Sequence, residues 1–361
     1  MKKSFTKSAL IVPIAALSLT CVGMAQDDVD MTPGTPKYVV LPPKPSTSAV
    51  KPATVLPTWN GSFVYSGTTY NYNMVGTAPS SNTSTTVPVF IIPVKIVVTS
   101  SGGTTTTFDP STVLTNGNTV TENTVTSPIY DKTTTYTQGG VDVGTSQYID
   151  AYQRANFWGT VQTSPNYHVL FGGPKVLPEI TLKPSSKDGK TGKPFGYTMG
   201  ELNLNWFDAE AQSYISKHSA EITPSTLPVF LLYDVYLTDF GCCIGGYHSS
   251  VGAQAYAQAT YVDIPGQFAQ DVSALSHESG EFVDDPLVNN SGNPVACGIL
   301  EVGDPLENNA NFGAYPYTLH GFQYNLQDLV TLPYFGAPPS TSVNDWFTFQ
   351  GETLSVCQNG G

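Results

Sequence analysis

The sequence predicts an α+β fold, in which a β-rich N-terminal half precedes a C-terminal half of mixed helices and strands. Residues 59–145 alternate short β-branched or aromatic runs with Gly, Asn, Ser and Thr, a pattern typical of strands and hairpins. The later part of the chain instead mixes segments of helical period with continuous apolar runs. With 361 residues and 40% hydrophobic content, the chain can build a substantial core.

Particular segments support this fold class. The run Val94–Val98 is the clearest buried strand of the first half, and 227–237 (LPVFLLYDVYL) is apolar on both faces, as expected of a central strand. Apolar residues recur at helical spacing in Ser146–Trp158 and in Asn205–Lys217. We therefore expect two helices there.

The N-terminus has the three parts of a secretory signal peptide. Lys2, Lys3 and Lys7 precede the apolar run Ala9–Leu19, and small residues stand at Gly23 and Ala25. We expect cleavage near Ala25 and a secreted or periplasmic protein. The apolar run is shorter than the roughly 20 residues that span a bilayer, and no later stretch is longer, so the sequence predicts no transmembrane segment.

The remainder divides into a linker and a folded part. Residues 26–57 are rich in proline and read as an extended linker, with room for one short strand at Tyr38–Leu41. Residues 58–361 are predicted to form one α+β domain. An alternative division is a β-rich part at 58–225 followed by a part at 226–361 that carries the site described below.

The charge excludes one class of partner. Removal of residues 1–25 takes away three lysines and no acids, which leaves 12 basic against 28 acidic residues and a net charge of −16. Such a surface repels phosphate backbones, so nucleic acid is not an expected partner. An excess of carboxylates suits a soluble exported protein and also suits cation binding.

Four cysteines follow the signal peptide, at Cys242, Cys243, Cys297 and Cys357. In an exported protein an even number predicts two disulfides. Because neighbouring cysteines rarely bond to each other, we expect Cys242 and Cys243 each to pair with one of the two distant cysteines, in either of two connectivities. A Cys/His metal site is the alternative, but it lacks a second closely spaced cysteine pair.

The segment DVSALSHESGEFVDDP is the clearest motif. Its apolar residues follow a helical period and Pro286 ends the pattern, which predicts a helix over Gln267–Asp284. On this helix His277 and Glu281 are one turn apart and can reach one ion. Glu278 is rotated by about 100°, the offset that lets the glutamate of zinc proteases address a metal-bound water. The alternative is a helix whose glutamates lie on a solvated face.

A zinc site of this type needs a third protein ligand and an open position for water. ILEVGDP at 299–305 supplies Glu301, which we favour, and Asp304. The competing candidates for this ligand are Asp284, Asp285, His248 and His320. Zn²⁺ is the expected ion; because two carboxylate ligands also suit harder ions, Mn²⁺ and Ca²⁺ are alternatives.

The segments SHESGEFVDDPLVNN and LEVGDP, preceded by CCIGGYHSS, resemble the phosphate-induced protein 1 (EXORDIUM-like) family and related secreted bacterial proteins over roughly residues 230–305. The shared features are a His-Glu-x-x-Glu helix, a following Asp/Asn-Pro, and a downstream Glu-x-x-Asp. The resemblance implies a zincin-like C-terminal half, and its plant members are described as growth-related extracellular proteins. It implies site roles for His277, Glu278, Glu281, Glu301 and Asp304, with His248 as a further candidate. Pro305 stands where a cysteine often follows the acidic pair, so the disulfide pattern is expected to differ.

Two functions are compatible with these features. The first is a secreted metal-dependent peptidase in which Glu278 is the general base and a tyrosine or histidine near Tyr247–His248 or Tyr315–His320 stabilises the oxyanion. Its partner would be a peptide or protein substrate. The second is a non-catalytic extracellular protein, adhesive or glycan-binding, whose cluster is a structural or relic metal site. The chain's 20 tyrosines support the second function, since aromatic rings commonly contact sugars and cell surfaces.

Overall fold

The computed structural model describes residues 33–45, 54–65, 67–239, 241–290, 300–340, 342–343 and 346–353. The predicted signal peptide, Cys297 and Cys357 lie outside these residues. The fold is a mixed one with more strand than helix, which agrees with the predicted α+β class. Within the described residues, no helix is both long and apolar enough to cross a membrane.

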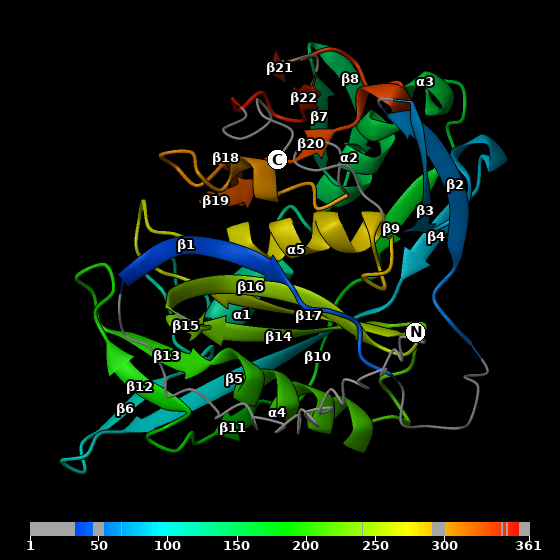
Figure 1. Ribbon diagram of the computed structural model, residues 1–361. Helices are drawn as coiled ribbons and strands as arrows, with labels where there is room; N and C mark the ends of the chain where they lie inside the picture. Colours follow the sequence, from blue (N-terminus) through cyan, green and yellow to red (C-terminus); the bar gives the residue numbers. More distant parts are fainter. Residues whose placement is uncertain are drawn as a thin grey trace, which may run out of the picture.

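An 11-stranded sheet of parallel and antiparallel strands forms the centre of the described structure (Figure 1). Its main path has the order β10-β5-β14-β17-β16-β15-β13-β12, while β1 pairs with β16 and both β6 and β11 pair with β5. The strands are β1 (Pro33–Val40), β5 (Val89–Thr99), β6 (Thr105–Phe108), β10 (Lys175–Val176), β11 (Ile180–Leu182), β12 (Gly189–Gly192), β13 (Met199–Asn203), β14 (Leu227–Tyr233), β15 (Val235–Thr238), β16 (Cys242–Val251) and β17 (Gln254–Tyr261).

The sheet contains both predicted buried strands. Val94–Val98 lies within β5, and the run 227–237 forms β14 and β15, which are separated at Asp234, where φ is +51°. β5 pairs with β14 in parallel. The residues before and after 225 therefore share one sheet.

A helix covers each face of this sheet (Figure 1). On one face α4 (Leu204–Lys217) buries Phe207, Ala211 and Ile215 against apolar side chains of the sheet. The side chain of Asn203 caps this helix by accepting from Trp206 N at 2.9 Å. The helix predicted at Asn205–Lys217 is thus confirmed to within one residue.

The opposite face carries α5 (Ser273–Asp284), the helix of the HESGE motif. The helix is shorter than predicted, because Ala269 and Asp271 have φ of +59° and +42°, outside the helical range. All 12 of its residues are buried. The sheet strands β16 and β17 lie on one side of α5, and α2 (Tyr148–Asn156) and β19 (Phe322–Gln327) pack on the other (Figure 1). The solvated acidic face considered above is therefore excluded.

The layer beyond α5 consists of short elements. The helix predicted at Ser146–Trp158 is present as α2 (Tyr148–Asn156), followed by α3 (Trp158–Val161). The small sheets are β2 (Thr58–Tyr65) with β3 (Thr68–Val75), β4 (Ser84–Val87) with β9 (His168–Phe171), β7 (Thr134–Gln138) with β8 (Val141–Ser146), β18 (Ala314–Leu319) with β19 (Phe322–Gln327), and β20 (Val330–Thr331) with β22 (Trp346–Thr348) and β21 (Ser342–Val343). The remaining elements of the described residues are α1 (Val120–Val125) and the 3-10 turns η1 (Pro79–Ser81), η3 (Asp304–Leu306) and η4 (Pro333–Phe335).

Part of the predicted linker is docked on the sheet. β1 runs parallel to β16, with Val40 opposite His248, and the pairing continues through Leu41 N to His248 O at 3.1 Å and Lys44 N to Ser250 O at 2.8 Å. The strand predicted at Tyr38–Leu41 is thus longer and begins earlier. Its position brings the N-terminal segment against α5.

The predicted pairing of the adjacent cysteines is wrong. Cys242 and Cys243 form a disulfide with each other at the start of β16. The peptide bond between them is cis and their Cα atoms are 3.1 Å apart. The sequence argument relied on the rarity of disulfides between adjacent cysteines, and this pair is an exception.

Candidate metal centre

The helix α5 presents His277 and Glu281 on one face, as their i, i+4 spacing predicts. His277 Nε2 lies 2.9 Å from Glu281 Oε1, and both side chains are at most 1% exposed. Burial of an imidazole and a carboxylate at this depth is costly unless each is paired or binds an ion. This pair is the first half of the candidate centre.

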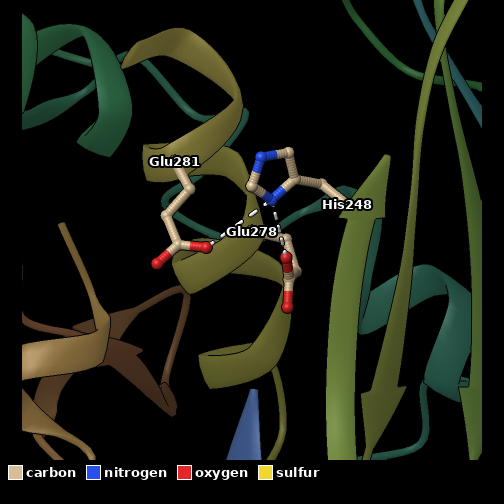
Figure 2. A group of neighbouring side chains, drawn as sticks. All are labelled: His248, Glu278 and Glu281. Atoms are coloured by element: carbon tan, nitrogen blue, oxygen red, sulfur yellow. Dashed lines mark hydrogen bonds and ion pairs between the residues drawn. The ribbon is translucent and has the colours of Figure 1, made fainter. Parts of the chain in front are cut away.

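The second half comes from β16 (Figure 2). Strand alternation directs His248 toward α5 and Tyr247 to the opposite face, where its hydroxyl donates to Asp208 Oδ1 at 3.2 Å. His248 Nδ1 lies 3.3 Å from Glu278 Oε2 and 3.6 Å from Glu281 Oε2. Glu281 therefore stands between two imidazoles, with Oε1 toward His277 and Oε2 toward His248.

Two further carboxylates come from the loop before η3 and from the first residue of η3. Glu301 Oε2 lies 4.0 Å from His248 Nε2, and Asp304 Oδ1 lies 3.6 Å from His277 Nε2. Gly303 N donates to Glu281 Oε1 at 3.3 Å, which fixes the loop to the helix. Of the two predicted candidates for the third ligand, Asp304 is thus on the His277 side and Glu301 on the His248 side.

Two glycines allow the backbone to approach these side chains. A Cβ atom on Gly246 of β16 would lie 2.6 Å from Glu278 Oε1, and one on Gly303 would lie 2.2 Å from His277 Nδ1. Since real Cβ atoms do not approach so closely, any larger residue would displace Glu278 or His277. Gly246 of CCIGGYHSS and Gly303 of LEVGDP are therefore needed for Glu278 and His277 to keep their positions.

The N-terminal strand closes the centre on the His277 side. The Tyr38 ring centroid is 4.0 Å from that of His277, at an interplanar angle of 33°. Tyr38 N also donates to Glu307 Oε1. Tyr38 is only 3% exposed, so the strand separates this imidazole from solvent.

Several polar atoms of the centre are buried without a hydrogen-bond partner. They are His248 Nε2, both ring nitrogens of His277, Glu278 Oε1 and Glu301 Oε2. His277 Nε2 is close to Glu281 but lacks the alignment of a hydrogen bond. Buried polar atoms are nearly always partnered, so five in one cluster are typical of a site that binds a ligand.

Burial and mutual charge shape the ionisation of the cluster. Burial raises the pKa of Glu278 to about 7, although the hydrogen bond from His248 opposes this effect. Burial and the charge of Glu281 together raise the pKa of Glu301 well above its usual range. Burial disfavours the ionised form of Glu281 as well, but His277 and His248 outweigh it and lower the pKa of this carboxyl. Glu281 is therefore the carboxylate most firmly held in its charged form.

The imidazoles show the reciprocal effect. Burial lowers the pKa of His248, but the charge of Glu301 and the hydrogen bonds to Glu278 and Glu281 outweigh it and raise the pKa well above the usual value. For His277, burial is likewise outweighed by Glu281, and its pKa is raised. Without a cation, the negative charge of the carboxylates is therefore balanced by protons bound to the two imidazoles.

Other candidates lie elsewhere or have structural partners. Asp285 accepts from Asn289 N at 3.0 Å and Asn290 N at 3.3 Å, and Asp284 accepts from Tyr152 Oη at 2.9 Å. His320 is exposed and lies 3.4 Å from Asp131 Oδ2. The contacts of Asp285 stabilise the turn that follows α5, and Asp284 joins α5 to α2.

The described residues thus contain buried His, Glu and Asp groups that could bind a metal ion. In two groups the ligand atoms all lie within 4.8 Å of one another: His248, Glu278 and Glu281 form one, and His277, Asp304 and Glu307 the other. Sequence reasoning missed Glu307 and Tyr38. Glu307 follows Asp304 by one turn of η3, a spacing that could have indicated it, whereas nothing local marks Tyr38.

Comparisons with known proteins do not assign the chain to a family. No family model matches the chain, and neither does any curated protein or solved structure. The function is therefore argued from the site.

Proposed function

We propose that this protein is a secreted metal-dependent hydrolase, a zincin-like peptidase that acts through the His-Glu-x-x-Glu helix. The observation that carries the proposal is the convergence on Glu281 of two buried imidazoles and several carboxylates, with unpartnered polar atoms facing one another. Purely structural histidines and glutamates at this depth are normally satisfied by hydrogen bonds. A cation would partner these atoms and balance the carboxylates.

His277 and Glu281 would hold the ion, together with either Glu301 or Asp304. Glu301 is the third ligand that the motif favours; Asp304 has the closer approach to His277, at 3.6 Å. Zn²⁺ accepts such a mixed nitrogen and oxygen set, and Mn²⁺ or Ca²⁺ would be tolerated where carboxylates dominate. When bound, the ion would supply Lewis acidity and lower the pKa of a water molecule toward 7.

Glu278 would then accept and return the proton that moves during hydrolysis. Glu278 follows His277 on α5, and its carboxylate is held 3.3 Å from His248 Nδ1. With a pKa raised by burial to about 7, Glu278 can accept a proton from an attacking water near neutral pH and return it to a leaving amine. His248 orients this carboxylate.

A second candidate function is supported by a different feature. The hairpin β2–β3 and the segment after α5 line a hollow with the amides of Asn60, Asn71 and Asn289 and the ring of Tyr70. Amides beside aromatic rings match the chemistry of sugar hydroxyls and sugar faces. A non-catalytic glycan-binding or cell-surface protein with a structural metal would use this hollow.

The test of the proposed function is the metal content of the purified mature protein, measured by elemental mass spectrometry beside two variants. His277→Ala is expected to lose metal, whereas Glu278→Gln keeps it and loses peptide hydrolysis. Circular dichroism checks that both variants fold. Wild-type protein that holds no metal after zinc is supplied and dialysed away would refute the proposal. Metal retained in every variant, with no hydrolysis of a mixed peptide library, would favour the glycan-binding alternative.

A further inference from the structure

The candidate centre is closed to a large substrate. His248, His277, Glu278 and Glu281 are each at most 1% exposed, and only the edge of the cluster, at Asp304, reaches solvent with 39% of its side chain. A peptidase must bring the bond that it cleaves to these groups. A peptide can therefore reach them only if a segment that covers them moves away.

The strand β1 is a segment that covers them. Its Tyr38 ring stacks on His277 at a centroid distance of 4.0 Å, and Tyr38 N donates to Glu307 Oε1. His277 and Glu307 are two of the three members of one group that could hold a metal ion. Both the side chain and the main chain of β1 thus occupy positions next to candidate metal ligands.

β1 is attached to the sheet in the way that a bound peptide would be. Among the described strands it pairs only with β16, and its register shifts between Pro33 and Lys37 and again between Lys37 and Val39 (Figure 1). β16 keeps β15 and β17 as further neighbours. Extended peptides commonly bind proteins by adding a strand to a sheet in this manner. Departure of β1 would leave the pairing of β16 with β15 and β17 intact.

An ion pair fastens the segment on the other face of the sheet. Lys44, which follows β1, pairs with Asp208 of α4. The lysine side chain is 42% exposed, whereas Asp208 is buried and also accepts from the hydroxyls of Tyr247 and Tyr256. This fastening lies away from the candidate metal ligands. It can therefore be removed without changing any of them.

The Tyr38 side chain fills a pocket suited to an aromatic ring. Besides His277, the ring contacts Phe268 at a centroid distance of 4.7 Å, and its hydroxyl lies 3.4 Å from Ser273 Oγ. Ring contacts of this kind favour an aromatic occupant over an aliphatic one. The pocket would select one side chain of any peptide that replaced β1.

We infer that β1 occupies a peptide-binding site and acts there as an intramolecular inhibitor. The inference rests on the proposed function and deepens it, because it names the substrate class: an extended peptide that pairs with β16 and places an aromatic side chain in the Tyr38 pocket. Displacement of β1 opens the centre on the His277 side. Peptide and β1 therefore compete for one position.

The test weakens the fastening in full-length mature protein and adds the segment back as a separate peptide. The probe is a fluorescein-labelled peptide of residues 33–45, and its binding is measured by fluorescence anisotropy. Lys44→Gln should bind it roughly two- to fivefold more tightly than wild type, the effect of a partly exposed ion pair. The same peptide with Tyr38→Ala should bind about tenfold more weakly. The matched control protein is Lys175→Gln, which breaks the exposed pair with Glu221 and should bind as wild type does.

Hydrogen exchange of the wild-type protein tests the movement directly. The amides of Leu41 and Lys44, which donate to His248 O and Ser250 O, should exchange faster than the amides of β17. Equal protection of the two strands would overturn the inference, because β1 would then open only when the whole fold opens. This result stands even if Lys44→Gln fails to fold.

Peptide hydrolysis separates this inference from the proposed function. Metal-loaded Lys44→Gln should cleave a mixed peptide library roughly two- to fivefold faster than wild type, in proportion to the weakened fastening. Equal rates in the two proteins would support the proposed function and overturn the inhibitory role of β1. Tyrosine-dependent binding of the 33–45 peptide without any hydrolysis would support the peptide site and overturn the proposed function. Binding that ignores the Tyr38→Ala change would overturn the peptide site itself.

Discussion

The ring of Tyr38, in the N-terminal strand, lies 4.0 Å from the ring of His277, in the helix of the centre. The two residues are 239 positions apart in sequence, and the contact exists because β1 pairs with β16, a strand that packs against α5. Tyr38 N donates to Glu307 in the same region. An N-terminal segment with the composition of a linker therefore forms one wall of the candidate centre.

Removing the Tyr38 ring should destabilise both the candidate centre and the fold. Tyr38→Ala is expected to lower the free energy of unfolding by about 3–5 kcal/mol, the usual cost of deleting a buried aromatic ring. Tyr38→Phe keeps the ring and loses only the long contact between Tyr38 Oη and Ser273 Oγ at 3.4 Å, so a loss below about 1 kcal/mol is expected. Chemical denaturation measures both. Equal losses in the two variants would show that the hydroxyl, rather than the ring, matters.

The stability of the metal-free protein should fall as pH rises. The pKa of Glu278 rises from 4.5 in the unfolded chain to about 7 in the fold because of burial, and burial likewise raises the pKa of Glu307 to about 7. Groups with a raised pKa stabilise the fold when protonated, and this contribution is lost between about pH 4.5 and 7. The raised pKa values of His248 and His277 act in the same direction.

Thermal melts at pH 5 and pH 8 check this prediction. With a chelator present, the melting temperature is expected to be lower at pH 8. With saturating metal the difference should shrink or reverse, because the ligands must lose protons to bind the ion. A melting temperature that rises steadily with pH in the presence of the chelator would contradict the interpretation that burial raises the pKa values of these groups.

Glu278 is expected to matter for turnover and little for metal retention. Glu278→Gln keeps the size of the side chain and removes the proton acceptor, so hydrolysis should fall by about 10²- to 10⁴-fold. In the wild type, activity should rise with pH as Glu278 ionises. A bound cation favours the carboxylate, so the midpoint should lie at or below about pH 7. Steady-state rates from pH 5 to 9 give this midpoint, and a wild-type level of activity in the variant would remove Glu278 from its role.

Gly280, in the middle of α5, should resist the usual stabilising change to alanine. In an ordinary helix Gly→Ala gains up to about 1 kcal/mol. Here a Cβ atom would lie 2.7 Å from Leu329 Cδ1, so Gly280→Ala is expected to destabilise the protein by about 1–3 kcal/mol.

A double-mutant cycle with Leu329→Ala isolates the cause of this loss. Leu329→Ala alone leaves a cavity and should cost about 2–5 kcal/mol. Combined with Gly280→Ala, which partly fills the cavity, it should cost less than the two single changes together. Additive losses would mean that contact with Leu329 is not the reason for the glycine.

The sequence by itself determined the local features of this protein. The spacing and the continuous runs of apolar residues predicted the helices α4 and α5 and the strands β5 and β14. The i, i+4 spacing of His277 and Glu281 predicted that both lie on one face of a helix. These features depend on residues within one or two turns of each other, so a local pattern contains them. The sequence also identified His248, Glu301 and Asp304 as candidate metal ligands. It did not show on which side of the cluster each of them lies.

Only the tertiary structure decided how these pieces meet. β16 brings His248 beside Glu278, β1 brings Tyr38 over His277, and a cis peptide bond joins Cys242 to Cys243. Strand order in a mixed sheet follows from the packing of the whole core, and no local pattern encodes it. The burial of every residue of α5 has the same origin, because a layer formed by distant segments covers the helix. That burial gathers histidines and carboxylates into groups that could bind a metal ion.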